Sequence, residues 1–344
     1  MKYLKHKGAT MLKSRRLLVM TLLVCMVLPQ NVWAVKKLAQ TGFKWLSIPV
    51  GARAIGMGGA VTTMDGDLTT IFWNPAGMAH IEGSGISFSN VAWIADINHM
   101  AASGAFKVSD RLVLTAQVIS VDYGDINGTM RANNSNGFID LGTFSPSGLS
   151  AGLGLSAAIS DKFSIGAVLK YCYEDLGTVF TSQDLAGGEL NEVDATLGVP
   201  AFDLGTLFYP GYKDLRIGMT LSNFSQEKSY VAESFPLPLT FRLGTAMNVL
   251  APFNISSNQK LTVALDLIHS RDYTERIHMG VEYSLNDMIA LRTGYKSNYD
   301  DENFTLGAGF KHHLGPLAFE FDYAFNNFST FNPVHLFTLG LSVK

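Results

Sequence analysis

The chain has 344 residues, a formal net charge of −3, and 16% charged against 47% hydrophobic residues. This charge content is low for a soluble protein, and no basic face is evident, so the composition gives no support for nucleic-acid binding. The mildly positive mean hydropathy is compatible with a soluble protein or a membrane barrel.

The first 34 residues predict a secretory signal peptide. Basic residues precede a short apolar run, and small residues follow it where signal peptidase cuts: Lys13, Arg15 and Arg16, then 17–28, then 32–34. The run is too short to favour a membrane anchor. Met1 and Met11 both remain possible starts, because 11–34 already forms a complete signal.

The next segment, residues 35–84, has the composition of a compact plug. Between Gly51 and Ala79 it combines a glycine-dense run, two acidic residues in a turn and the sequence Trp73-Asn74-Pro75-Ala76-Gly77. Glycines permit close backbone approach or positive φ, and Asn-Pro marks a turn. The candidate plug residues are Gly51, Arg53, Gly56, Gly58, Gly59, Asp65, Asp67, Asn74, Pro75, Ala76 and Gly77. We expect Arg53 to pair with Asp65 or Asp67, and Asn74 to cap a turn against a barrel wall.

These residues resemble the N-terminal region of the PorV/PorQ family of outer-membrane proteins, which are relatives of the FadL long-chain fatty-acid transporters. The resemblance covers about thirty residues closely. It implies a fourteen-stranded barrel closed by an N-terminal hatch that carries an Asn-Pro-Ala motif, which matches Asn74, Pro75 and Ala76 here.

From about Gly85 onward the dominant period is two, which predicts strands. In 317–325 the residues Leu, Phe, Phe, Tyr and Phe alternate with Ala, Glu, Asp and Ala. Fourteen strands of about 9 to 12 residues are predicted, a length that suits tilted strands crossing a bilayer. They begin near Gly85, His99, Arg111, Leu149, Phe163, Ala195, Leu215, Leu239, Leu261, Glu275, Met288, Phe304, Leu317 and His335.

The connections alternate between short turns and longer polar segments, as in outer-membrane barrels with short periplasmic turns. The longer ones are 122–148, 177–194, 224–238, 297–303 and 326–334. Residues 85–344 are therefore predicted to form an all-β, antiparallel transmembrane barrel in the bacterial outer membrane, in contact with its lipid. A periplasmic sandwich is the alternative, and it would have to protect its sheet edges.

Charged residues on the polar strand faces must point into such a barrel, because a charge facing lipid is costly. They are Lys170, Glu174, Arg216, Arg242, Asp266, Arg276, Glu282, Arg292, Lys296, Lys311, Glu320 and Asp322. We expect a salt-bridge network that holds the lumen and plug. A polar conduit for a ligand is the alternative.

No catalytic, metal or cofactor signature stands out. The histidines lack ligand spacing, the glycine run is not a dinucleotide fingerprint, and Cys172 fits a packed side chain better than a nucleophile. The chain is not predicted to be an enzyme.

Two functions follow from the resemblance. The first is an accessory of type IX secretion that binds exported proteins or secretion-machine subunits. The second is a FadL-like uptake channel for long-chain fatty acids or other hydrophobic small molecules. Phe138, Leu141 and Phe144 are the best hydrophobic ligand contacts in a long loop that is otherwise mostly small and polar, which favours the first function.

Overall fold

A computed structural model describes residues 40–181, 191–230, 233–251 and 258–344. The predicted signal peptide, residues 1–34, lies outside these ranges, as does the start of the predicted plug.

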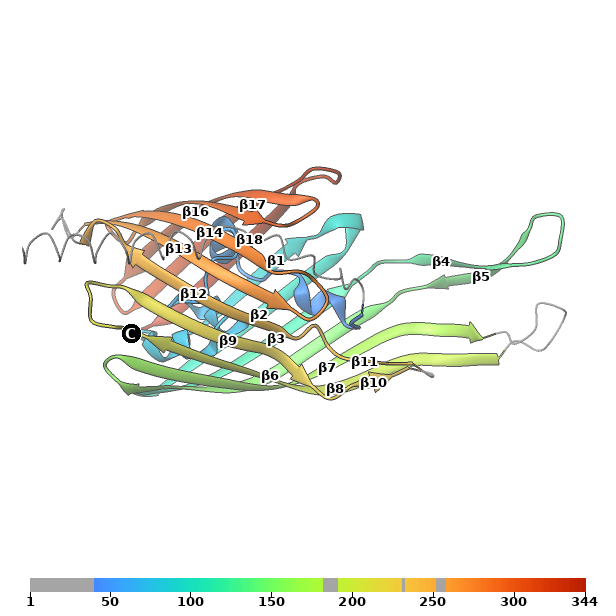
Figure 1. Ribbon diagram of the computed structural model, residues 1–344, viewed down its shortest axis with the longest axis horizontal. Coiled ribbons are helices and arrows are strands. Elements are labelled where there is room, and N and C mark those ends of the chain that lie inside the picture. The colour runs from blue at the N-terminus through green and yellow to red at the C-terminus, as the bar shows by residue number, and fades with distance from the viewer. Residues whose placement is uncertain (1–39, 182–190, 231–232, 252–257) are drawn as a thin grey trace, which may run out of the picture. The chain divides into compact units, whose positions relative to one another are not determined.

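Fourteen antiparallel strands form a closed barrel, as the sequence predicts (Figure 1). The first strand pairs with the last, so no edge remains. The strands are β1 (Ser84–Ala92), β2 (Asn98–Ser109), β3 (Leu112–Asp122), β6 (Ser147–Ser160), β7 (Phe163–Thr181), β8 (Asn191–Phe208), β9 (Arg216–Ser225), β12 (Thr240–Asn248), β13 (Gln259–Ser270), β14 (Arg276–Leu285), β15 (Ile289–Ser297), β16 (Glu302–Leu314), β17 (Leu317–Phe328) and β18 (Val334–Val343).

The strand alternation separates an apolar outer surface from a polar interior. In β17 the side chains of Phe319 and Phe321 are exposed on the outside, whereas Asp322 is buried inside. Across the barrel the exposed residues are mostly large and apolar, for example Leu153 and Leu339. Lipid must cover such a belt. Because the barrel has no edge strand, no unpaired backbone group faces that lipid. The chain is an outer-membrane barrel.

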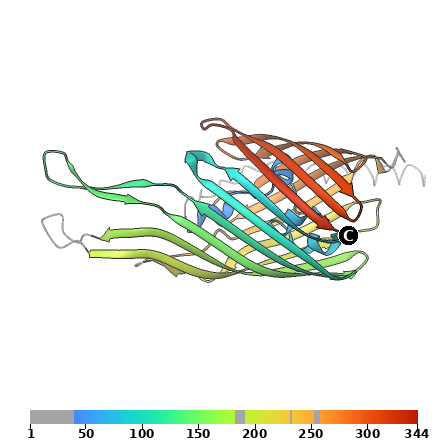
Figure 2. The same cartoon turned by 180° about the vertical axis from the view of Figure 1, so that it is seen from behind.

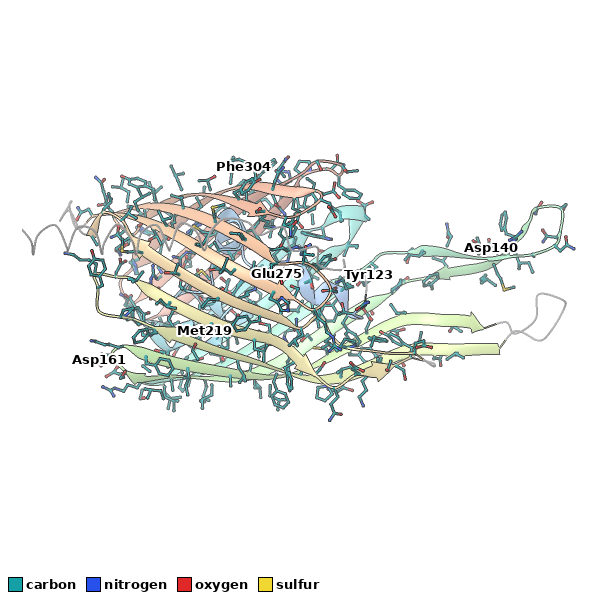
Figure 3. The ribbon with its side chains drawn as sticks, viewed as in Figure 1. Tyr123, Asp140, Asp161, Met219, Glu275 and Phe304 are labelled. Atoms are coloured by element: carbon teal, nitrogen blue, oxygen red, sulfur yellow. The ribbon has the colours of Figure 1, made fainter. Side chains whose placement is uncertain are left out.

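The two ends of the barrel differ in their connections. Short turns, one containing Asp161, lie at the end that holds the C-terminus, and Asp140 lies on a projection from the opposite end (Figure 3). Short turns face the periplasm in outer-membrane barrels, so both ends of the strand series are periplasmic. Among the described residues, no helix is long and apolar enough to cross a membrane.

The external end carries structure that the sequence patterns did not indicate. Residues 122–148, expected as a polar loop, contain a hairpin of β4 (Ile126–Arg131) and β5 (Phe138–Phe144). Strands β7 and β8 have 19 and 18 residues, well beyond the expected length, and they extend into the predicted 177–194 loop. A second small hairpin pairs β10 (Lys228–Ser229) with β11 (Ser234–Phe235).

Residues 41–83, here called the lumen segment, lie inside the barrel. Their short helices are η1 (Lys44–Ser47), α2 (Ala52–Gly56), η2 (Leu68–Phe72) and η3 (Pro75–His80), and a further turn, η4 (Ile94–Asp96), follows β1. Helix α2 packs against β15 to β18, and η3 packs against β6 to β8. Figure 2 shows these helices, in blue, between opposite walls. The lumen segment therefore contacts strands on all sides.

Candidate functional site

The Asn-Pro-Ala sequence joins the lumen segment to the wall. The Asn74 side chain accepts from the Ala76 N–H at 3.0 Å, which caps η3, and its Nδ2 donates to the Thr62 carbonyl at 2.6 Å. The same Nδ2 donates to the Thr206 carbonyl of β8 at 3.0 Å. Pro75 begins η3, and its carbonyl accepts from Ser156 Oγ of β6 at 2.7 Å. Asn74 therefore caps a turn against the barrel wall, as expected.

Glycines on the inner face of the wall allow the lumen segment to approach backbone to backbone. A β-carbon built on Gly294 would overlap the backbone of Gly58, and one on Gly280 would overlap the carbonyl of Met57. Six wall glycines lie this close to the lumen segment and are called the glycine seat: Gly166, Gly205, Gly218, Gly280, Gly294 and Gly307. Five of them meet its backbone, and Gly205 meets the side chains of Asn74 and Pro75. At these six positions the wall therefore has no side chain between its own backbone and the segment.

The glycines of the lumen segment have two roles. Gly51, Gly58 and Gly59 adopt positive φ, at 89°, 65° and 75°, where other residues are strained. Gly56 instead faces Gly307 of β16 at close range. The turn that these glycines form ends at Thr62, whose N–H and hydroxyl donate to Asp266 of β13 at 2.9 and 2.7 Å.

A salt-bridge network joins the lumen segment to the wall, and it includes four of the expected inward-pointing charges: Arg216, Glu282, Arg292 and Asp322. Arg53 donates from Nε and Nη2 to both oxygens of Glu282 on β14, each at 2.9 Å, and from Nη1 to Asp67 at 3.2 Å. Arg292 donates to the same Glu282 at 2.6 Å and also pairs with Asp322. A bidentate arginine–carboxylate pair is directional as well as strong, so it fixes the position of α2.

Of the two acids considered for Arg53, Asp67 is the partner and Asp65 is not. Asp65 accepts from Arg216 Nη1 at 2.7 Å and from the Tyr209 hydroxyl at 2.6 Å, both near the β8–β9 turn. Burial, together with the Asp65 carboxylate, raises the pKa of Tyr209, so its phenol stays a donor.

Aromatic rings hold other inward-pointing cations in the external half of the lumen. The Arg276 guanidinium lies 3.8 Å from the ring centres of both Tyr273 and Tyr299, and that of Arg242 lies 4.9 Å from Trp73. Trp73 is buried, so it belongs to the core.

An aromatic pocket of about 420 Å³ lies between the start of the lumen segment and the external connections. Small-molecule pockets span roughly 300 to 1,000 Å³, so this volume suits a small ligand. Tyr230 and Phe235 stack with ring centres 5.3 Å apart, and Phe43 lies 6.5 Å from Phe235. The lining residues are Gln40, Thr41, Gly42, Phe43, Lys44, Tyr123, Glu174, Leu176, Tyr230 and Phe235.

Polar groups also face this external pocket. Glu174, on the inner face of β7, accepts a hydrogen bond from the Tyr230 hydroxyl. Burial and the charge of Glu174 raise the pKa of Tyr123 to about 12, and burial raises that of Tyr230 as well. Both tyrosines are therefore protonated donors at neutral pH.

The periplasmic end holds a larger and more polar cavity of about 570 Å³. Charged residues of both signs line it, including Asp65, Arg216, Lys311 and Glu320. This cavity lies on the periplasmic side of the lumen segment, and the aromatic pocket lies on its external side. The glycine seat therefore separates a charged space from an aromatic one.

Phe138, Leu141 and Phe144, the expected ligand contacts, lie on β5 of the external hairpin. Within the described residues, none of the three lines either cavity. The aromatic residues that do gather, Phe43, Tyr230 and Phe235, were not singled out from the sequence. Their signal is weak, because Phe43 comes from the lumen segment and the other two from the β9–β12 connection, and only the closed barrel brings these two segments together.

The described part of the chain brings together no group of three or more His, Cys, Asp and Glu side chains suited to a metal ion. Cys172 is buried in the core.

No family model matches the chain, and no curated protein matches it. Several solved structures share its fold. The toluene transporter TbuX of Ralstonia pickettii has a TM-score of 0.58 at 12% identity, covering 86% of this chain and 98% of that one. The toluene transporter TodX of Pseudomonas putida has a TM-score of 0.56 at 11% identity, covering 90% and 99%. A FadL homologue of Pseudomonas aeruginosa has a TM-score of 0.54 at 12% identity, covering 86% and 98%.

At these identities the likeness concerns the fold. The neighbours are outer-membrane transport proteins, and their fold matches the FadL-like part of the expected resemblance. The likeness to PorV/PorQ and the secretion role that it implied receive no support from them.

Proposed function

We propose that the chain is an outer-membrane channel for the uptake of small hydrophobic compounds, including aromatic hydrocarbons, and that the lumen segment is its plug. This is the second of the two functions expected from the sequence. The toluene transporters with the same fold make monoaromatic compounds the first candidates.

The aromatic pocket is the single observation that carries the proposal. Three stacked or neighbouring rings, Phe43, Tyr230 and Phe235, face a pocket of about 420 Å³ directly above the lumen segment. A concave, mostly apolar pocket with few polar groups is the usual form of a small-molecule site. A ligand arriving from outside meets this pocket before it meets the seat.

The salt bridges and the glycine seat support the role of plug. Close packing of the segment's backbone against the wall supports a plug that restricts the passage of ions and polar solutes. With the barrel plugged, a hydrophobic compound must first bind to the protein in order to cross the outer membrane. An open pore would instead let small solutes diffuse through without binding.

Toluene uptake by cells that express the chain tests the proposal. We expect Tyr230→Ala and Phe235→Ala to slow uptake at low toluene concentration, because each removes a ring from the pocket. Tyr212→Ala is the matched control, since Tyr212 is an exposed aromatic residue at the periplasmic end. Equal uptake with and without the chain, in cells with verified outer-membrane expression, would overturn the proposal.

A further inference from the structure

We propose that Glu174 makes the aromatic pocket selective for uncharged hydrophobic compounds that carry a hydrogen-bond donor, such as phenols, over compounds that carry a carboxylate. The inference rests on the proposed function, because it names the class of ligand that the same pocket takes.

Glu174 is a buried acid on the wall of an otherwise aromatic pocket. Its side chain points inward from β7 and is only 5% exposed. One oxygen, Oε2, accepts from the Tyr230 hydroxyl, and Tyr230 stacks on Phe235. The carboxyl group therefore lies against the rings that would hold a ligand.

The charge of Glu174 has no partner among the described residues: none of their cations lies within salt-bridge distance of it. The one cation lining the pocket, Lys44, is paired instead with Asp272, which also accepts from Thr41 at 2.9 Å. A second acid, Asp175, follows Glu174 in the chain and accepts from the Gly177 N–H at 2.8 Å. The Glu174 carboxyl thus has a hydrogen-bond donor but no ion-pair partner among the described residues.

This arrangement discriminates between ligands by simple electrostatics. A carboxylate brought into a partly desolvated pocket beside Glu174 is repelled, because like charges interact strongly where water is scarce. A hydroxyl group can instead donate to the carboxyl oxygens, which hold more lone pairs than Tyr230 uses. Burial and, to a lesser extent, the nearby Glu174 carboxylate raise the pKa of Tyr123, which lines the same pocket.

Three ligands of similar shape separate these effects: toluene, 4-methylphenol and 4-methylbenzoate. We would measure their binding to the detergent-solubilised, folded protein by calorimetry at neutral pH. We expect 4-methylphenol to bind about tenfold more tightly than toluene, as a hydrogen bond to a charged acceptor allows, and 4-methylbenzoate about tenfold more weakly.

Glu174→Gln removes the charge and keeps an oxygen that accepts from Tyr230. In this variant we expect both differences to shrink. Asp175→Asn is the matched control: it removes a neighbouring charge, keeps an acceptor for Gly177, and should leave the wild-type order intact.

The possible results separate the two proposals. If toluene binds but the three ligands bind equally, or if Glu174→Gln leaves their order unchanged, the role of Glu174 is overturned and the channel proposal stands. If none of the three binds to folded protein, both proposals fail.

Discussion

At the residue scale, Asn74 links the plug turn to the barrel wall. One side chain caps η3 and donates to carbonyls on both the lumen segment and β8. Asn74→Ala removes all three bonds and leaves the Thr62 carbonyl without this donor. We expect a loss of about 2 kcal/mol in the stability of the plug against local opening, because unsatisfied buried polar groups cost that order of energy.

The measurement for Asn74→Ala is the rate of limited proteolysis within residues 41–83 of the folded barrel. Asn134→Ala, at the exposed hairpin tip, serves as the control. Equal cleavage of the two variants would show that Asn74 does not hold the plug.

Arg53 links the lumen segment to the opposite wall. Its replacement by methionine keeps length but leaves Glu282 with Arg292 alone. We expect the plug to be destabilised by about 3 kcal/mol, the usual cost of removing one partner of a buried ion pair. Increased ion conductance in planar bilayers would report the loosened plug.

Arg53→Lys is the informative companion variant. Lysine keeps the charge but cannot form the two-pronged contact with Glu282. We expect an intermediate conductance. A wild-type conductance in both variants would contradict an anchoring role for this network.

Sequence patterns could predict some of these contacts but not all of them. The turn chemistry of Asn-Pro predicted the Asn74 cap, and nearness in sequence made Asp67 a reasonable partner for Arg53. The partners of Asp65 lie 144 and 151 residues away. The alternating pattern shows that Arg216 points into the barrel. It does not show which residue of the lumen segment Arg216 contacts, because that depends on the position of the segment inside the barrel.

At the element scale, we expect the glycine seat to set the depth of the lumen segment in the barrel, because the two backbones meet there. Gly294→Ala would place a methyl group into the backbone of Gly58, so the plug must shift. Overpacking of this kind costs about 1 to 3 kcal/mol, and we expect higher ion conductance and a lower temperature of heat-modifiable unfolding.

Gly104→Ala is the matched control, because a β-carbon on this strand glycine would meet nothing closer than 3.9 Å. If both variants conduct ions like the wild type, the seat does not position the plug.

The β4–β5 hairpin allows the earlier ligand assignment to be tested directly. Replacement of residues 126–144 by a short Gly-Ser turn removes Phe138, Leu141 and Phe144 together. We expect normal assembly and unchanged toluene uptake, because these residues do not line the aromatic pocket. Loss of uptake by a correctly assembled variant would assign the hairpin a role in capture.

The alternating pattern predicted all fourteen barrel strands because each has one face in lipid and one in a polar interior. The hairpin gave no such signal. Both of its faces are largely exposed, so its apolar and polar residues show no regular alternation against a core. The extensions of β7 and β8 were missed for the same reason: their outer parts lie beyond the apolar belt.

At the scale of the whole molecule, the closed ring of strands and the lumen segment inside it form one structure. The barrel satisfies its backbone hydrogen bonds around the ring, which makes it stable in lipid. The lumen segment fills the ring through backbone contacts, capped turns and ion pairs. The aromatic pocket is left on the external side of the plug and the charged cavity on the periplasmic side.

The central claim is that this closed barrel admits hydrophobic compounds while excluding ions. Both properties can be measured in one preparation of proteoliposomes, as toluene influx and as ion conductance. We predict toluene influx above that of protein-free liposomes, with a conductance near the background and greatly increased by Gly294→Ala. Substantial ion conductance of the wild-type protein without toluene influx would contradict the account.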